Sequence, residues 1–326
     1  MLTRRHLALT TLAAALALTT AAQAQTQELA FGIISTESSQ NLRQAWQPLL
    51  DDMGQRLGMK VTAFFATDYA GIIEAMRFNK VQVAWYGNKS AMEAVDRAQG
   101  EVFVQTIAVD GSAGYYSTLV THKDSPLNSL DDVIKQRANL TLGFGDPNST
   151  SGTLVPGYYA FARNGVDPMK DFKRVVRANH ETNLLAAANK QVDVATNNNE
   201  NMERLFKTQP AKAKDIKVIW QSPVIPSDPL VWRTDLDATT KAKVREFFLA
   251  YGKNSERELS ILKTIGFGGF KPSSNAQLIP IRQLELARER SRIEADTAML
   301  PADKAKKLQE IDGKLAELGR QVAAAN

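Results

Sequence analysis

Short apolar runs alternate with amphipathic runs twice along the chain, and this pattern limits the possible folds more than any other feature. The first series places strand-like runs and helical patterns in turn at 29–35, 43–57, 60–65, 70–77 and 81–86. The second series places them at 140–145, 153–163, 172–177, 182–189 and 192–196. Alternation of this kind is typical of α/β architecture, and its repetition predicts two α/β lobes.

Four further β-rich stretches lie outside the two series. They lie at 102–109 and 115–122, between the series, and at 218–222 and 230–233, around a proline-rich segment after the second. A chain that leaves one lobe, builds another and returns needs two connections, and an extended pair of them would act as a hinge. We therefore expect lobe one to comprise residues 25–115 and 227–326, and lobe two residues 116–226.

The rest of the chain has a helical pattern. Residues 239–251 are amphipathic, 266–272 read as a turn-rich break, and 279–326 are expected to add helices to lobe one. In the final segment an apolar stripe recurs at spacings of 3, 4, 3 and 4, formed by Leu308, Ile311, Leu315, Leu318 and Val322. Two heptads are too few to predict a coiled coil. Docking on the same chain and a homodimer through these helices are therefore equally open.

The first 24 residues have the pattern of a secretory signal peptide. Arg4 and Arg5 precede an uncharged apolar run at 7–18, and Ala22-Gln23-Ala24 is a small-x-small cleavage site. The two arginines also resemble a twin-arginine signal, so the export route stays open between that system and ordinary secretion. No later run has transmembrane length, so the mature chain is expected to be soluble outside the cytoplasm.

Composition excludes several classes of function. The chain has no cysteine, so it forms neither disulfides nor thiolate metal sites. The 40 basic residues are dispersed among 35 acidic ones, without a basic run, and nucleic acid is therefore not an expected partner. His122 and His180 are the histidines beyond the signal peptide and lie far apart in sequence. We expect no metal site and no cofactor.

The decapeptide 143–152, GFGDPNSTSG, has the features of an anion-binding loop. It follows a strand-like run and precedes a helical one, and unpaired N–H groups at a helix start, with the hydroxyls of Ser149, Thr150 and Ser151, form a cradle for an oxyanion. A Walker A loop would need a lysine after its second glycine, and none is present. The alternative is an ordinary N-cap.

Ligands of open α/β sheets bind beyond the carboxyl ends of the strands. This rule selects six loops that are rich in hydroxyls, amides, aromatics and acids and contain no Lys or Arg, at 35–38, 67–71, 85–88, 146–152, 179–183 and 197–201. Such a cleft can hold an anion on neutral donors at one end and a cation against carboxylates and aromatic rings at the other. Glu200 and Asp228 are the candidates for the cation end, and the alternative for each is an exposed loop acid or an N-cap.

Five blocks together resemble the periplasmic phosphonate-binding proteins of ABC importers: 31–38 (FGIISTES), 68–72 (DYAGI), 84–88 (AWYGN), 145–152 (GDPNSTSG) and 180–183 (HETN). The likeness runs from about Leu29 to Leu286. It implies a type II-like, two-lobed periplasmic binding protein fold with additional C-terminal helices, located in the periplasm, that delivers a phosphonate to an ABC transporter membrane permease.

The resemblance also implies the roles of individual residues. Ser149, Thr150 and Ser151 would hold the phosphonate, assisted by Tyr69 and His180. The amino group of 2-aminoethylphosphonate would be received by Tyr115, Glu200 and Asp228, and the presence of both acids favours this aminated ligand.

Two other classes of function compete with this interpretation. A secreted phosphate-ester hydrolase or transferase would need an activated nucleophile or a metal, and neither a Gly-x-Ser-x-Gly elbow nor a His-Glu-x-x-His motif occurs. A sensory module that presents its ligand to a receptor would use the same closed lobes, and the sequence does not separate it from an importer component.

Overall fold

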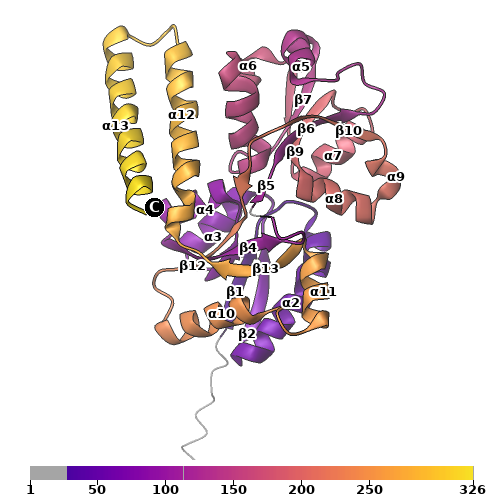
Figure 1. Ribbon diagram of the computed structural model, residues 1–326, viewed down its shortest axis with the longest axis vertical. Helices are drawn as coiled ribbons and strands as arrows, with labels where there is room; N and C mark the ends of the chain where they lie inside the picture. Colours follow the sequence, from indigo (N-terminus) through magenta and orange to yellow (C-terminus); the bar gives the residue numbers. More distant parts are fainter. Residues whose placement is uncertain (1–27, 113, 326) are drawn as a thin grey trace, which may run out of the picture.

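The computed structural model describes residues 28–112 and 114–325, which form two α/β lobes (Figure 1). Each lobe is built on its own β-sheet, so the expected α/β fold with two lobes is confirmed. The predicted signal peptide, residues 1–24, lies outside the described residues. In the part of the chain that is described, no helix is both long and apolar enough to cross a membrane.

The first sheet has six strands in the order β13–β4–β12–β3–β1–β2. Its strands are β1 (Glu28–Ile33), β2 (Lys60–Phe65), β3 (Val83–Trp85), β4 (Gly100–Ala108), β12 (Pro229–Arg233) and β13 (Phe267–Pro272). Strands β2, β1 and β3 pair in parallel, whereas β12 and β13 pair antiparallel to their neighbours. The helices of this lobe are α2 (Ser39–Leu57), α3 (Tyr69–Arg77), α4 (Asn88–Arg97), α10 (Ala238–Ala250) and α11 (Glu256–Thr264).

Helices cover the first sheet, which is why the central strands read as continuous apolar runs. Phe31 of β1 is fully buried and its ring centroid lies 5.6 Å from that of Trp46 on α2 and 6.1 Å from that of Phe248 on α10. The aromatic residues at helical spacing in 239–251 thus build the core of lobe one rather than a site.

The second sheet has five strands in the order β10–β6–β9–β7–β8. These are β6 (Ser117–His122), β7 (Thr141–Phe144), β8 (Arg174–Arg177), β9 (Val194–Asn198) and β10 (Ile216–Gln221). The helices around it are α5 (Leu130–Gln136), α6 (Pro168–Asp171), α7 (His180–Ala188), α8 (Asn199–Thr208) and α9 (Pro210–Ala213), with a short 3₁₀ turn at Arg137–Asn139. β7 pairs in parallel with β8 and β9, as the alternating pattern predicts.

Two segments cross between the lobes, and they pair with each other. β5 (Gly114–Tyr115) follows β4, and β11 (Ile225–Pro226) precedes β12; together they form a two-stranded antiparallel ribbon. A Cβ atom at Gly114 would lie only 2.0 Å from the carbonyl oxygen of Ile225, so this close pairing requires glycine. The two connections that were expected to form a hinge are thus hydrogen-bonded to each other.

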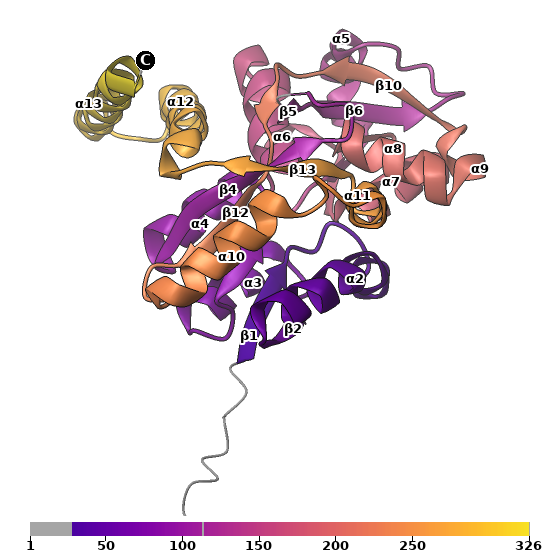
Figure 2. The ribbon, with the colours of Figure 1, turned by 60° about the horizontal axis from the view of Figure 1, so that its bottom comes forward.

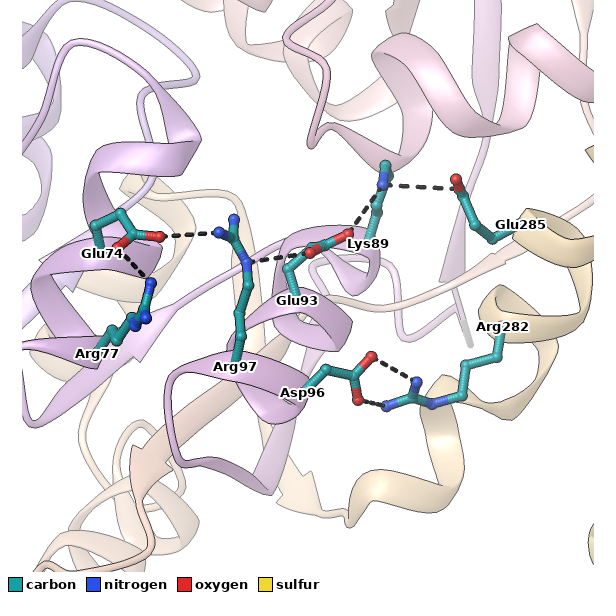
Figure 3. A network of polar contacts seen from close by, with 8 residues as sticks. All are labelled: Glu74, Arg77, Lys89, Glu93, Asp96, Arg97, Arg282 and Glu285. Carbon is teal, nitrogen blue, oxygen red and sulfur yellow. Dashed lines mark hydrogen bonds and ion pairs between the residues drawn. The ribbon is translucent and has the colours of Figure 1, made fainter. Parts of the chain in front are cut away.

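The C-terminal helices α12 (Ile279–Ala295) and α13 (Pro301–Ala325) form an antiparallel hairpin beside the two lobes (Figures 1 and 2). A short 3₁₀ segment, Asn275–Leu278, leads into α12. Ile311 of the predicted stripe is buried, and α13 packs on α12, so the stripe is at least partly used within the chain. α12 itself contacts α4 of lobe one and the irregular helix 157–164 of lobe two. Arg282 and Glu285 tie it to Asp96 and Lys89 of α4 (Figure 3).

Two local predictions were wrong. The segment 266–272 is not a turn-rich break, because residues 267–272 form the edge strand β13, whose glycines allow an irregular register against β4. The helix after the anion loop was expected to begin at Thr153, but it begins at Thr150 with π-helical turns over Thr150–Leu154 and Gly157–Phe161 and ends in 3₁₀ geometry. The wide first turn sets Ser149, Thr150 and Ser151 directly at the helix start.

Candidate functional site

A cavity of about 240 Å³ lies between the two lobes. All eight residues predicted for the site line it: Tyr69, Tyr115, Ser149, Thr150, Ser151, His180, Glu200 and Asp228. Each of the six loops selected at the strand ends contributes to its wall. The loops that the strand-end rule selects in the two lobes thus face each other across one cavity.

The three hydroxyls of the anion loop are fixed by N–H groups that donate to them. Gly152 N donates to Ser149 Oγ at 2.9 Å, Lys89 N donates to Thr150 Oγ1 at 2.8 Å, and Asn198 Nδ2 donates to Ser151 Oγ at 3.0 Å. A hydroxyl that accepts a hydrogen bond keeps its own proton for donation. The loop thus presents three positioned O–H donors, which suit an anion.

The glycines of this loop allow the chain to fold back on itself. Gly145 N donates to the carbonyl oxygen of Gly152 at 3.0 Å, and a Cβ atom at Gly145 would lie 2.6 Å from the Cα atom of Gly152. Thr196 of β9 donates to the same carbonyl at 2.7 Å. These contacts anchor the loop to the sheet, so the hydroxyls are held in place before any ligand arrives.

His180 and Tyr69 are helix-start residues next to this loop. His180 begins α7, is buried, and has its Nε2 atom 3.3 Å from Ser149 Oγ. Burial lowers the pKa of His180 to about 4, so its ring is neutral at neutral pH. Its Nδ1 atom is buried without a hydrogen-bond partner among the described residues. Tyr69 begins α3 and is also buried. Both side chains can assist an anion without adding a formal charge.

The other end of the cavity is acidic. Tyr115 donates its hydroxyl to Asp228 Oδ1 at 3.0 Å. Burial raises the pKa of Asp228 to about 7, against the opposing hydrogen bond from Tyr115. Burial, followed by the negative charge of Asp228, raises the pKa of Glu200 to about 8. These two carboxyl groups, of which Asp228 is buried and Glu200 partly buried, repel each other when ionised, and a nearby cation would stabilise their ionised forms.

The asparagine triplet before Glu200 has a structural role. Asn198 caps α8 by accepting from Asn201 N, Asn197 donates to the carbonyl oxygen of His180 at 2.8 Å, and Asn199 accepts from Tyr116 N at 2.7 Å. These bonds fix the start of α8, and with it the position of Glu200, relative to α7 and the hinge. The sequence pattern predicts a loop at 197–201 and does not predict helix α8, which begins at Asn199.

Direct contacts join the lobes around the cavity. The Glu181 carboxylate of lobe two accepts from Ser38 N at 3.1 Å and from Asn41 Nδ2 at 2.8 Å, at the start of α2. Asp146 Oδ2 accepts from Tyr69 N at 3.1 Å, at the start of α3. Arg204 of α8 pairs with Glu37. The structure is thus a closed state in which lobe two supplies acceptors to helix starts of lobe one.

The sequence reasoning missed several residues of the cavity wall. Trp85 and Gly87 belong to a selected loop and line the cavity, so the strand-end rule contained the signal to find them. The wall also includes three cations outside the selected loops, Arg204, Lys207 and Lys263, which lie on α8 and α11. Their positions depend on helix packing, and nothing in the local sequence indicated them.

The Ser149–His180 pair is not arranged for nucleophilic catalysis. A general base needs a pKa near the working pH and a third group that orients its ring. The pKa of His180 is far too low, and its Nδ1 atom has no orienting partner in the described part of the chain. Among the described residues there is also no group of three or more His, Asp or Glu side chains that could hold a metal.

Known proteins resemble this chain over most of its length. Residues 31–278 match the family model described as ABC transporter, phosphonate, periplasmic substrate-binding protein. The chain is 57% identical over 299 residues to the phosphonates-binding periplasmic protein of Escherichia coli (strain K12), with 92% of this chain and 88% of that protein covered.

Solved structures agree with this match. The binding protein component of an ABC phosphonate transporter from Pseudomonas aeruginosa has a TM-score of 0.90 and 54% identity, with 92% of this chain and 99% of that one covered. A protein from Prochlorococcus marinus (MIT 9301), solved in complex with methylphosphonate, has a TM-score of 0.72 and 21% identity, with 79% and 97% covered. This second likeness supports the fold.

Proposed function

The chain belongs to the family of periplasmic substrate-binding proteins of phosphonate ABC transporters, and on this premise we propose that its ligand is 2-aminoethylphosphonate. Members of this family are transport components and not enzymes, so the hydrolase or transferase alternative is set aside. The observation that carries the proposal is the presence of Glu200 and Asp228 in the same closed cavity as the three loop hydroxyls.

In this proposal the two ends of the ligand meet opposite environments. Ser149, Thr150 and Ser151 donate to the phosphonate oxygens, with Tyr69 and His180 beside them. The ammonium group lies between Glu200 and Asp228, and Tyr115 holds the second acid in place. Neutral donors bind the anion without a fixed positive charge, and the acids make the amine a condition for tight binding.

In this proposal, discrimination against ligands without an amine comes largely from the free-energy cost of leaving the two acids without a cation. A ligand that lacks the amine leaves two carboxyl groups buried and without a cation, which costs several kcal/mol if both are ionised. Closure would then need protonation of the acids, as their raised pKa values indicate. The free energy of binding therefore depends on the group at the far end of the ligand.

The test is calorimetry with 2-aminoethylphosphonate and methylphosphonate. A charge-assisted hydrogen bond contributes about 1.5–3 kcal/mol, so Glu200→Gln and Asp228→Asn should each weaken binding of the aminated ligand about tenfold to a hundredfold. Methylphosphonate binding should change far less. Glu203→Gln is the matched control, because Glu203 is an exposed acid that also lines the cavity. Equal losses for both ligands would show that neither acid meets the amine.

Three further parts of the proposal concern organisation and partners. We assign residues 25–115 and 227–326 to lobe one and 116–226 to lobe two. An importer component is preferred to a sensory module because of the family. Self-association through α12 and α13 stays a prediction, which sedimentation analysis of the mature chain tests directly; a monomer at micromolar concentration would argue against it.

A further inference from the structure

Three helices of lobe one begin at the interface with lobe two, and each meets an acceptor of lobe two. The start of α2 meets the Glu181 carboxylate, the start of α3 meets the Asp146 carboxylate, and Lys89 N at the start of α4 meets only the neutral hydroxyl of Thr150. A helix start favours negative charge. Two of the three starts therefore meet a carboxylate of lobe two, whereas the α4 start meets only a hydroxyl of that lobe, with Asp228 near its N-cap Gly87.

The α4 start is held rigidly in this position. Asn88 Nδ2 donates to the carbonyl oxygen of Pro226 in the hinge ribbon at 2.7 Å, and Asn88 Oδ1 accepts from Gln277 Nε2 at 2.9 Å. The N-cap residue, Gly87, has no side chain to cap the helix and lines the cavity. The α4 start thus reaches the cavity wall fixed to the hinge.

The ammonium group of Lys89 does not serve the cavity. Its Nζ atom lies 3.4 Å from Glu93 Oε1 and 3.7 Å from Glu285 Oε2 of α12 (Figure 3), and its side chain is only 7% exposed. The positive charge of this lysine is therefore used between α4 and α12. What Lys89 offers the site is its backbone N–H group.

Glycine at position 87 is explained by space and not by backbone conformation. Its φ of −76° and ψ of 162° are open to any residue. A Cβ atom there would lie 3.2 Å from Thr150 Oγ1, tighter than an ordinary contact, and 3.9 Å from Asp228 Oδ1, an ordinary one. A side chain at 87 would thus press on the Thr150 hydroxyl, which accepts a hydrogen bond from Lys89 N.

The geometry points to the α4 start as a part of the phosphonate subsite that lobe one contributes in addition to Tyr69, with Gly87 as the positioning residue that lets it close onto Thr150. Thr150 accepts from Lys89 N and donates its own proton to the phosphonate, so the two bonds strengthen each other. The ligand supplies the negative charge that Glu181 and Asp146 supply at the other two helix starts. This inference rests on the proposed function and assigns to Gly87 and Lys89 N a role in coupling anion binding to closure.

The test is a double-mutant cycle of Gly87→Ala and Thr150→Ala, read by calorimetry with methylphosphonate and with 2-aminoethylphosphonate. We expect Gly87→Ala to weaken both ligands by a similar factor of about ten, the loss of one good hydrogen bond. In the Thr150→Ala background the same change should cost less than about twofold, because the atom it displaces is gone. In the Thr150→Ser background, which keeps the hydroxyl, the full effect should return.

Controls separate this effect from damage to the fold. Gly319→Ala on α13 adds a methyl group with nothing within 4 Å and should leave both affinities unchanged. The ligand-free melting temperature of Gly87→Ala should stay close to that of the parent. The inference would be overturned if Gly87→Ala left both affinities unchanged. It would also be overturned if the effects of Gly87→Ala and Thr150→Ala on the binding free energy were additive.

The outcomes also distinguish this inference from the proposed ligand. Coupling in the cycle without any preference for 2-aminoethylphosphonate would mean that the proposed ligand is wrong and the α4 start is correctly assigned. A clear preference for 2-aminoethylphosphonate, together with additive effects in the cycle, would mean that the proposed ligand is right and that the α4 start is wrongly assigned. Binding of neither phosphonate by the parent chain would overturn both.

Discussion

The buried acid pair makes the affinity for an aminated ligand depend on pH. In the closed structure the pKa of Glu200 is raised to about 8 and that of Asp228 to about 7, in both cases chiefly by burial. At pH 6 both groups therefore carry protons in this state, and an ammonium group that needs two carboxylates must displace them. Raising the pH removes these protons in advance, so binding of 2-aminoethylphosphonate should strengthen.

The magnitude follows from the pKa values. The rise for Glu200 from 4.5 to about 8 corresponds to about 5 kcal/mol against ionisation in the closed structure, at about 1.4 kcal/mol per pKa unit. Opening of the lobes hydrates both acids and lowers their pKa values, so part of this cost is avoided in the free protein. We therefore expect release of about one proton per ligand at pH 6, and at least a tenfold gain in affinity between pH 6 and pH 8.

The assay is isothermal titration calorimetry at pH 6, 7 and 8 in buffers of different ionisation enthalpy, which gives the number of protons released. Methylphosphonate is the control because it has the phosphonate head but no amine, and the titration of each free ligand, which differs because the ammonium group lowers the phosphonate pKa, is measured separately and subtracted. The difference in proton release between the two ligands should disappear in the Glu200→Gln/Asp228→Asn variant. Equal proton release for both ligands in the parent chain would refute the reasoning, since the acids would then not respond to the ammonium.

Three further predictions follow from the same contacts. A carboxyl pKa that is raised in the folded state means that the native chain binds more protons than the unfolded one between pH 4.5 and 8, so the ligand-free melting temperature should fall as pH rises through this range, and less so in Glu200→Gln. Glu181→Gln removes the charge at the start of α2, and small-angle scattering should show a larger open fraction of the ligand-free chain, with Glu203→Gln unchanged. Lys89→Met leaves Glu285 without its partner from α4, and should lower the melting temperature by about 2–6 °C and speed hydrogen exchange in α12.

The fold was largely predictable because its signals are local. Apolar runs become strands at the predicted places, and β2 has the same bounds, 60–65, in the sequence pattern and in the structure. The failures also have local causes. The segment 266–272 has three glycines, and the two that lie within β13, Gly268 and Gly269, are accommodated at the sheet edge by an irregular register. The asparagines of 197–199 predict a loop at the start of α8 because Asn favours caps and turns alike.

The site was predictable to a lesser degree. The strand-end rule places loops but not distances, so it brought Thr150 and Glu200 to one cavity without showing which groups bond across it. The contact between Lys89 N and Thr150 Oγ1 joins residues 61 positions apart and depends on how the lobes close. No sequence pattern near Lys89 or near Thr150 predicts this contact. The role of Gly87 was hidden for the same reason, since the atom that excludes a side chain there lies on the other lobe.

Charge balance explains why the anion end needs no lysine or arginine. Five helix starts reach the cavity: α3, α4, α7, α8 and the helix after the anion loop. The start of α3 already meets the Asp146 carboxylate, so four remain, and at roughly half a positive charge each they supply about two elementary charges. In the proposed complex, two ionised acids and a dianionic phosphonate with one ammonium group sum to three negative charges, of which the dipoles offset about two thirds. A dianionic phosphonate without an ammonium group would raise this sum to four negative charges, and protonation of Glu200 and Asp228, whose pKa values are raised to about 8 and about 7, would then restore the balance.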